Sequence, residues 1–75
     1  MTKKLSNISL RDYRKFLIEI GCKCNRTKGG HEHWSRADLD RPLTLSAHID
    51  PVPAFIIRQY LRHLIITTKE FLEMI

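Results

Sequence analysis

Apolar residues recur at helical spacing early in the chain and predict an amphipathic helix. Ser9 and Asp12 mark its start, because a serine N-cap with an acid three residues later is a short version of the capping box. Gly21 is expected to end the helix, since glycine readily takes the left-handed conformation that follows many helices. The apolar stripe consists of Leu10, Tyr13, Phe16, Leu17 and Ile20, and the opposite face carries Arg11, Arg14, Lys15 and Glu19.

The pattern then changes to a period of two, which predicts strands. Residues 22–27 and 31–36 form two extended segments, and residues 28–30, with two glycines, are typical of a hairpin turn. A turn rich in aspartate and proline, residues 38–42, leads to a third strand over residues 43–48. This strand alternates the apolar Leu43, Leu45 and Ala47 with the outward-facing Thr44, Ser46 and His48.

Two further helices are predicted toward the C-terminus. Pro53 suits the first turn of one of them, and Thr67 with Glu70 forms a capping box for a short last helix. The apolar stripe of the longer helix is Ile56, Ile57, Tyr60, Leu61, Leu64 and Ile65, and the last helix carries Phe71, Leu72 and Ile75.

The order of these elements predicts an α+β fold of two layers, α-β-β-β-α, with a short C-terminal helix. A three-stranded antiparallel sheet can bury one face under two amphipathic helices, which is an economical arrangement for so few residues. The other face of the sheet then stays open to water or to a ligand. Residues 1–75 are expected to form a single domain, too small for a deep enclosed pocket.

The positive net charge of the chain indicates which class of binding partner to expect. Thirteen Lys and Arg against eight Asp and Glu give a net charge of +5, which favours a polyanion, either nucleic acid or an acidic protein. No apolar run approaches membrane-spanning length and no signal-peptide core is visible, so we expect a cytoplasmic protein without a membrane partner. The basic residues include Lys3, Lys4, Arg11, Arg14, Lys15, Lys23, Arg26, Lys28, Arg58 and Arg62.

The hairpin register decides whether the cysteines and histidines can share a metal. An even loop would place Cys22, Cys24, His31 and His33 on one face, where they could bind zinc. An odd loop, with the glycines forming a bulge, would instead place both cysteines with Trp34 and send the histidines to the other face. We favour the odd loop, because burial of Trp34 under the helices is worth more than that of any smaller neighbour. The cysteines are then reduced, small core residues.

The histidines after the glycine pair are candidates for acid–base chemistry, although exposed strand histidines often have no role. Gly29 and Gly30 give access to the backbone, and the cations of Arg26 and Lys28 lie close in sequence. Imidazole can accept and return a proton near neutral pH, which makes His31 and His33 the candidate catalytic groups. No GxGxxG, P-loop or HExxH motif and no serine nucleophile elbow is present.

Three stretches of the chain resemble the HicA (YcfA-like) toxins of bacterial HicA and HicB toxin–antitoxin pairs. "RKFLIEIGCKCNRTKGGHEHW" is similar to the family's leading helix, glycine, strand and K-G-S-H signature. "PLTLSAHIDPVPAFIIRQYLRHL" and "TTKEFLEMI" are similar to its third strand, following helix and closing segment. The resemblance covers residues 9–75 and lies in the order and spacing of these pieces.

The resemblance implies a small ribonuclease that cleaves messenger RNA without a metal or cofactor, on a fold similar to the double-stranded RNA-binding domain. Lys28, Gly29 and His31 match the family's lysine, glycine and catalytic histidine, whereas Gly30 replaces the serine of the signature. Glu32 stands where a second histidine is common, which makes His33 an alternative helper.

In this interpretation His31 is the general base, and Arg26, Lys28, Gly29 and Gly30 contact the RNA. A HicB-like acidic antitoxin is the expected protein partner. Two alternatives stay open: a non-catalytic module that binds structured RNA through shape and phosphate contacts, and a small docking domain whose basic surface only binds a protein.

Overall fold

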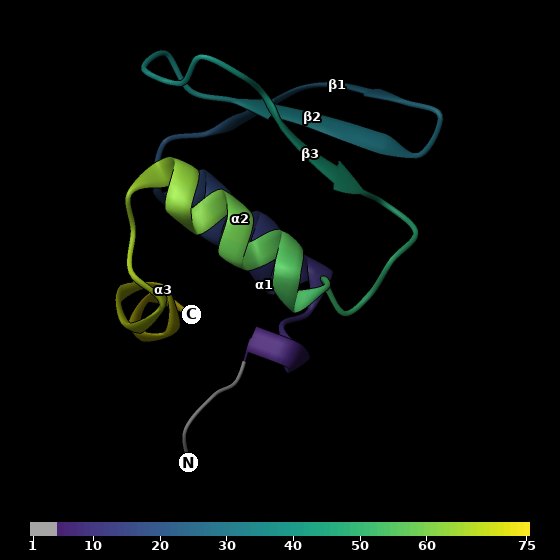
Figure 1. Ribbon diagram of the computed structural model, residues 1–75. Helices are drawn as coiled ribbons and strands as arrows, with labels where there is room; N and C mark the ends of the chain where they lie inside the picture. The colour runs from purple at the N-terminus through teal and green to yellow at the C-terminus, as the bar shows by residue number, and fades with distance from the viewer. Residues whose placement is uncertain (1–4) are drawn as a thin grey trace.

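The computed structural model describes residues 5–75 and has the expected α+β architecture (Figure 1). Lys3 and Lys4, two of the basic residues named above, lie outside this range. None of the helices formed by residues 5–75 is both long enough and apolar enough to cross a membrane.

The elements are a short 3-10 helix η1 (Leu5–Asn7), then α1 (Leu10–Glu19), β1 (Lys23–Lys28), β2 (His31–Ser35), β3 (Leu43–Ser46), α2 (Ala54–Leu64) and α3 (Thr68–Met74). The three strands form one antiparallel sheet in the order β1-β2-β3.

Helix α1 begins and ends where its sequence signals predict. The Ser9 side chain accepts a hydrogen bond from the Asp12 N–H at 3.0 Å. The Asp12 carboxylate does not return the bond, so only half of the expected capping box forms. Instead, Asp50, 40 residues further along, accepts from the Leu10 N–H at 3.0 Å and satisfies a second free donor of the first turn. Gly21 follows the helix with φ of 92°, the left-handed conformation expected of it.

Both long helices cover the same face of the sheet. Figure 1 shows α1 and α2 on one side of the strands, with α3 on the side of the helices away from the sheet. Phe71 of α3 packs edge-on against Phe16 of α1, with ring centroids 4.6 Å apart. The buried core joins α1 (Tyr13, Phe16, Leu17), the sheet (Trp34, Leu43, Leu45), α2 (Ile57, Leu61, Leu64) and Phe71. The opposite face of the sheet is therefore left uncovered.

The two C-terminal helices begin close to where the sequence predicts, with Pro53 as the N-cap of α2 and with Thr67 and Glu70 forming the full capping box of α3. The prediction that Ile65 belongs to the buried stripe is wrong, since this side chain is 90% exposed. Its φ of 59° is left-handed and reverses the chain at the end of α2, and its N–H donates to the Arg62 carbonyl at 3.2 Å. The half-buried Ile66 packs against the core in its place.

The hairpin loop corrects the predicted register. Lys28 pairs with His31, so the loop contains only Gly29 and Gly30 and is even, not odd. Both glycines have positive φ, 59° and 79°, as a two-residue turn between twisted strands favours. The glycines therefore form a tight turn and not a bulge.

The bulge lies further back in β1, where the register shifts between Cys24 and Arg26. Asn25 is an extra residue that is paired with no residue of β2, so the side chains before it point to the opposite face from the one that an unbroken strand would give them. Cys24 therefore pairs with Trp34 and shares its face, as expected. Cys22 is buried, and burial raises the pKa of its thiol, which keeps it protonated. The prediction that Cys24 is also a core residue is wrong, because the whole of β1 is an exposed edge strand that the helices do not reach.

Candidate functional site

The uncovered face of the sheet carries polar side chains in two rows across the strands. Residues paired directly across antiparallel strands share a face and bring their side chains together. His31 begins β2 at the turn, and His33 lies on the same face two residues later. One row is Lys28, His31 and Ser46, and the other is Arg26, His33 and Thr44. The pairing therefore brings every predicted site side chain onto one surface.

His31 is exposed, and its ring is oriented by the turn that precedes it. The Nδ1 atom lies 3.2 Å from the carbonyl oxygen of Gly29. A carbonyl oxygen can only accept, so Nδ1 is the donor in this bond, and in the neutral ring Nε2 then carries the lone pair. The exposed nitrogen is thus the one that can accept a proton from a substrate.

The charge on this face is positive. Lys28 and Arg26 are exposed, and neither has an ion-pair partner among residues 5–75. No acidic residue belongs to either row. His33, half-buried beside Arg26, is less accessible than His31. An anion on this face would meet Lys28 beside the imidazole of His31 and Arg26 beside that of His33.

The Gly29–Gly30 turn is packed against a second histidine. β3 ends at Ser46, earlier than predicted, and the next N–H, of Ala47, donates to the Gly30 carbonyl at 2.8 Å. His48 therefore lies beyond the strand and not on its outward face. A Cβ on Gly30 would fall 2.5 Å from Cδ2 and from Nε2 of His48, so the ring occupies the space beside the glycine. The alternation that places His48 after Ser46 on the outward side of the third strand was the signal in the sequence that this histidine could lie near His31.

Glu32 points the other way, into the helix side of the sheet. Its carboxylate accepts from Arg14 Nε at 3.2 Å and Nη2 at 2.5 Å, and from Trp34 Nε1 at 3.0 Å. Arg14 therefore does not stand free on the polar face of α1, as its spacing predicts, but is ion-paired to the sheet. Strand alternation could have revealed this network, because it places a carboxylate beside Trp34 on the buried face, where a charge needs a partner.

The network determines the ionisation of Glu32. Burial by itself would raise the pKa of Glu32, but the hydrogen bonds from Arg14 and Trp34 and the charge of Arg14 outweigh it. The pKa of this carboxyl therefore lies below its ordinary value of 4.5. Glu32 is a structural anion that fastens β2 to α1.

The four candidate zinc ligands do not converge. Cys24 shares its face with Trp34, whereas His31 and His33 project from the opposite face. Over residues 5–75, no group of three or more His, Cys, Asp or Glu side chains is arranged to hold a metal ion.

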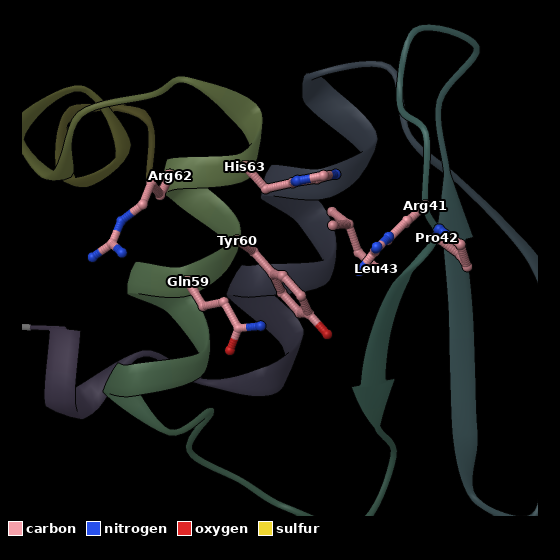
Figure 2. A pocket seen from close by; sticks show the side chains of 7 residues that line it. All are labelled: Arg41, Pro42, Leu43, Gln59, Tyr60, Arg62 and His63. Carbon is pink, nitrogen blue, oxygen red and sulfur yellow. The ribbon is translucent and has the colours of Figure 1, made fainter.

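The free edge of β3 is closed by Tyr60 of α2, whose hydroxyl accepts from the Thr44 N–H at 3.0 Å and donates to the Thr44 carbonyl at 2.8 Å. A polar hollow of about 550 Å³ adjoins this contact. Figure 2 shows Arg41 and His63 extending into it from opposite sides, while Arg62 points away. His31 does not line this hollow.

A second hollow, of about 290 Å³, adjoins Tyr60 and is lined by His31. Its wall is mainly apolar and includes Phe55 and Ile49, which are 64% and 49% exposed. An accessible aromatic ring and an aliphatic side chain thus lie in the same hollow as the candidate base. Neither residue is predicted as part of a site from the sequence.

No protein-family model, curated protein or solved structure matches this chain. The chemistry proposed below is therefore argued from the geometry of the site, and the toxin role and the antitoxin from the resemblance described above.

Proposed function

We propose that this protein is a metal-independent endoribonuclease that cleaves messenger RNA, acting as the toxin of a HicA-like toxin–antitoxin pair. The observation that carries the proposal is His31. Its Nδ1 is engaged by the Gly29 carbonyl, its ring is exposed, and Lys28 lies across the strand from it. A base with an adjacent cation suits the first half of RNA transesterification, in which the 2′-OH loses its proton and charge develops on the phosphate.

In the proposed reaction, His31 Nε2 takes the proton from a ribose 2′-OH. The 2′-oxygen then attacks the adjacent phosphorus, forming a 2′,3′-cyclic phosphate as the bond to the 5′-oxygen breaks. Lys28 and Arg26 stabilise the charge that develops on the phosphate oxygens. Gly29 lets the phosphate approach the backbone, since nothing lies within 4 Å of the place a Cβ would take there, whereas at Gly30 the His48 ring occupies that place. DNA, which lacks the 2′-OH, would not be cleaved.

The hollow beside His31 is suited to an unstacked base. Sequence-tolerant binding of single-stranded RNA commonly combines cations along the backbone with aromatic rings on which bases stack. Phe55 and Ile49 provide the apolar surface, and Arg26 and Lys28 provide the cations. We therefore place one base of the RNA against Phe55, with its ribose toward His31.

The proposed protein partner is an acidic, HicB-like antitoxin that covers His31 and is bound in the cytoplasm. The net charge of +5 and the two free cations on the open face suit an acidic surface as well as RNA. The two ligands would then compete for the same face.

Incubating the purified protein with RNA in EDTA tests the function. Cleavage is expected to continue in the chelator, because no step uses a metal. RNA binding without cleavage would favour the non-catalytic RNA-binding module, and neither binding nor cleavage would favour the docking domain. A reaction abolished by EDTA and restored by a divalent cation would contradict the proposed chemistry.

A further inference from the structure

The imidazole of His48 lies against Gly30, the residue immediately before His31. It fills the position that a side chain on Gly30 would take, where a Cβ would be 2.5 Å from its Nε2. The bond from the Ala47 N–H to the Gly30 carbonyl, 2.8 Å long, fixes the adjoining backbone to the turn. Both histidines are exposed. Two accessible imidazoles thus adjoin one backbone residue, although 17 positions separate them in sequence.

Transesterification of RNA moves two protons, and His31 accounts for one of them. The 2′-OH loses its proton as the new O2′–P bond forms, and the departing 5′-oxygen must gain one as the P–O5′ bond breaks. A protonated imidazole supplies the second proton near neutral pH. We propose that His48 is a second catalytic residue, the general acid that protonates the 5′-oxygen. This inference rests on the proposed function.

His48 suits this step better than His33, the helper expected from the sequence. His33 is half-buried and lies two residues along β2, about 7 Å from His31 at the usual rise of a strand. His48 is exposed, lies outside both rows, and reaches the turn from a separate segment of the chain. A phosphate bound at the turn would then have a base and an acid supplied by two different segments.

A change of leaving group separates this role from a structural one. Replacing His48 by glutamine is expected to slow RNA cleavage by about 10²- to 10⁴-fold, the usual contribution of a general acid. The same variant should cleave a nucleoside 3′-(4-nitrophenyl phosphate) at nearly the parent rate, because 4-nitrophenolate leaves without a proton. His63→Gln, which changes an exposed histidine on α2, is the matched control and should retain both activities.

The glycine contact gives an independent test. Gly30→Ala should displace the His48 ring, and so lower RNA cleavage while largely sparing the nitrophenyl ester. Gly29 also has positive φ, but a Cβ added there would have no neighbour within 4 Å. Gly29→Ala therefore measures the effect of backbone strain alone. A Gly30→Ala variant that slows both substrates to the same degree as Gly29→Ala would contradict a role for His48.

The outcomes distinguish the two proposals. If His31→Ala abolishes RNA cleavage while His48→Gln does not, the endoribonuclease stands and His48 is not the acid. If His48→Gln slows both substrates equally, or if His33→Gln alone shows the selective loss on RNA, His48 is again excluded. If the parent protein cleaves neither substrate, the proposed function fails, and the role of His48 fails with it.

Discussion

Replacing His31 by alanine is expected to lower the rate of RNA cleavage by about 10²- to 10⁴-fold, because general base catalysis typically contributes that much. The ring is exposed and makes one hydrogen bond, to the Gly29 carbonyl, so its loss removes no core packing. The variant should therefore fold like the parent and still bind RNA. Cleavage of a labelled RNA in EDTA measures the rate, and the fluorescence of Trp34 reports whether the fold is retained.

His63→Ala is the matched control for this change, because His63 is also exposed and lies on α2, outside the two rows. It should cleave RNA like the parent. The role given to His31 would be wrong if both alanine variants degraded RNA at the parent rate.

Replacing Glu32 by alanine is expected to lower the free energy of unfolding by about 2 to 3 kcal/mol. Breaking a buried ion pair commonly costs about 3 to 5 kcal/mol, and leaving a buried donor unpaired about 1 to 3 kcal/mol. Trp34 Nε1 would lose its buried acceptor, whereas the Arg14 side chain is 37% exposed and can turn to water, which reduces the cost. Urea unfolding followed by Trp34 fluorescence measures the change. Glu73→Ala, an exposed glutamate of α3, should change stability little.

The same network makes stability depend on pH. The pKa of Glu32 is lowered in the folded protein. The contribution of Glu32 to the stability of the fold is therefore fully present above pH 4.5, and it is lost as the pH falls through the lowered pKa. Glu32→Gln should therefore lose less stability than the parent on acidification, although Asp38 and Glu70, whose pKa values are also lowered, keep part of the dependence. Equal losses for parent and variant would mean that Glu32 is not held as an anion by Arg14 and Trp34.

The helices and the order of the strands were predictable because local signals specify them. Ser9, Gly21 and Thr67 act on backbone groups within a few residues, and amphipathic spacing defines the buried faces. Ile65 is the exception. Its side chain fits the apolar spacing of α2. The helix ends at this residue, however, and the left-handed backbone that turns the chain there leaves the side chain exposed.

The hairpin register was harder to predict, because the length of the loop and the bulge in β1 have opposite effects on which side chains share a face. The even Gly29–Gly30 turn alone would have placed Cys24 and the histidines together, and the bulge at Asn25 separates them again. Asn25 carries no strong sequence signature of a bulge. The expected separation of Cys24 from His31 thus came from the burial of Trp34 and not from a correct loop length.

Periodicity indicated the sides of the sheet on which Glu32 and His48 lie, but it did not identify their partners in distant segments. His48 lies against Gly30 because β3 ends at Ser46, a boundary that the continuing alternation hides. Arg14 fits the polar face of α1 by spacing, yet it reaches the carboxylate of Glu32 on β2. Both cases depend on how separate elements pack together in space, which the spacing within one element does not specify.

The most direct measurement concerns the ribose hydroxyl from which His31 is proposed to take a proton. An RNA strand carrying one 2′-deoxynucleotide at a mapped cleavage position is incubated with the protein in EDTA, beside the all-ribose strand. The expected result is a 2′,3′-cyclic phosphate end from the all-ribose strand and no cleavage at the deoxy position. Cleavage at the deoxy position would contradict proton abstraction from the 2′-OH by His31.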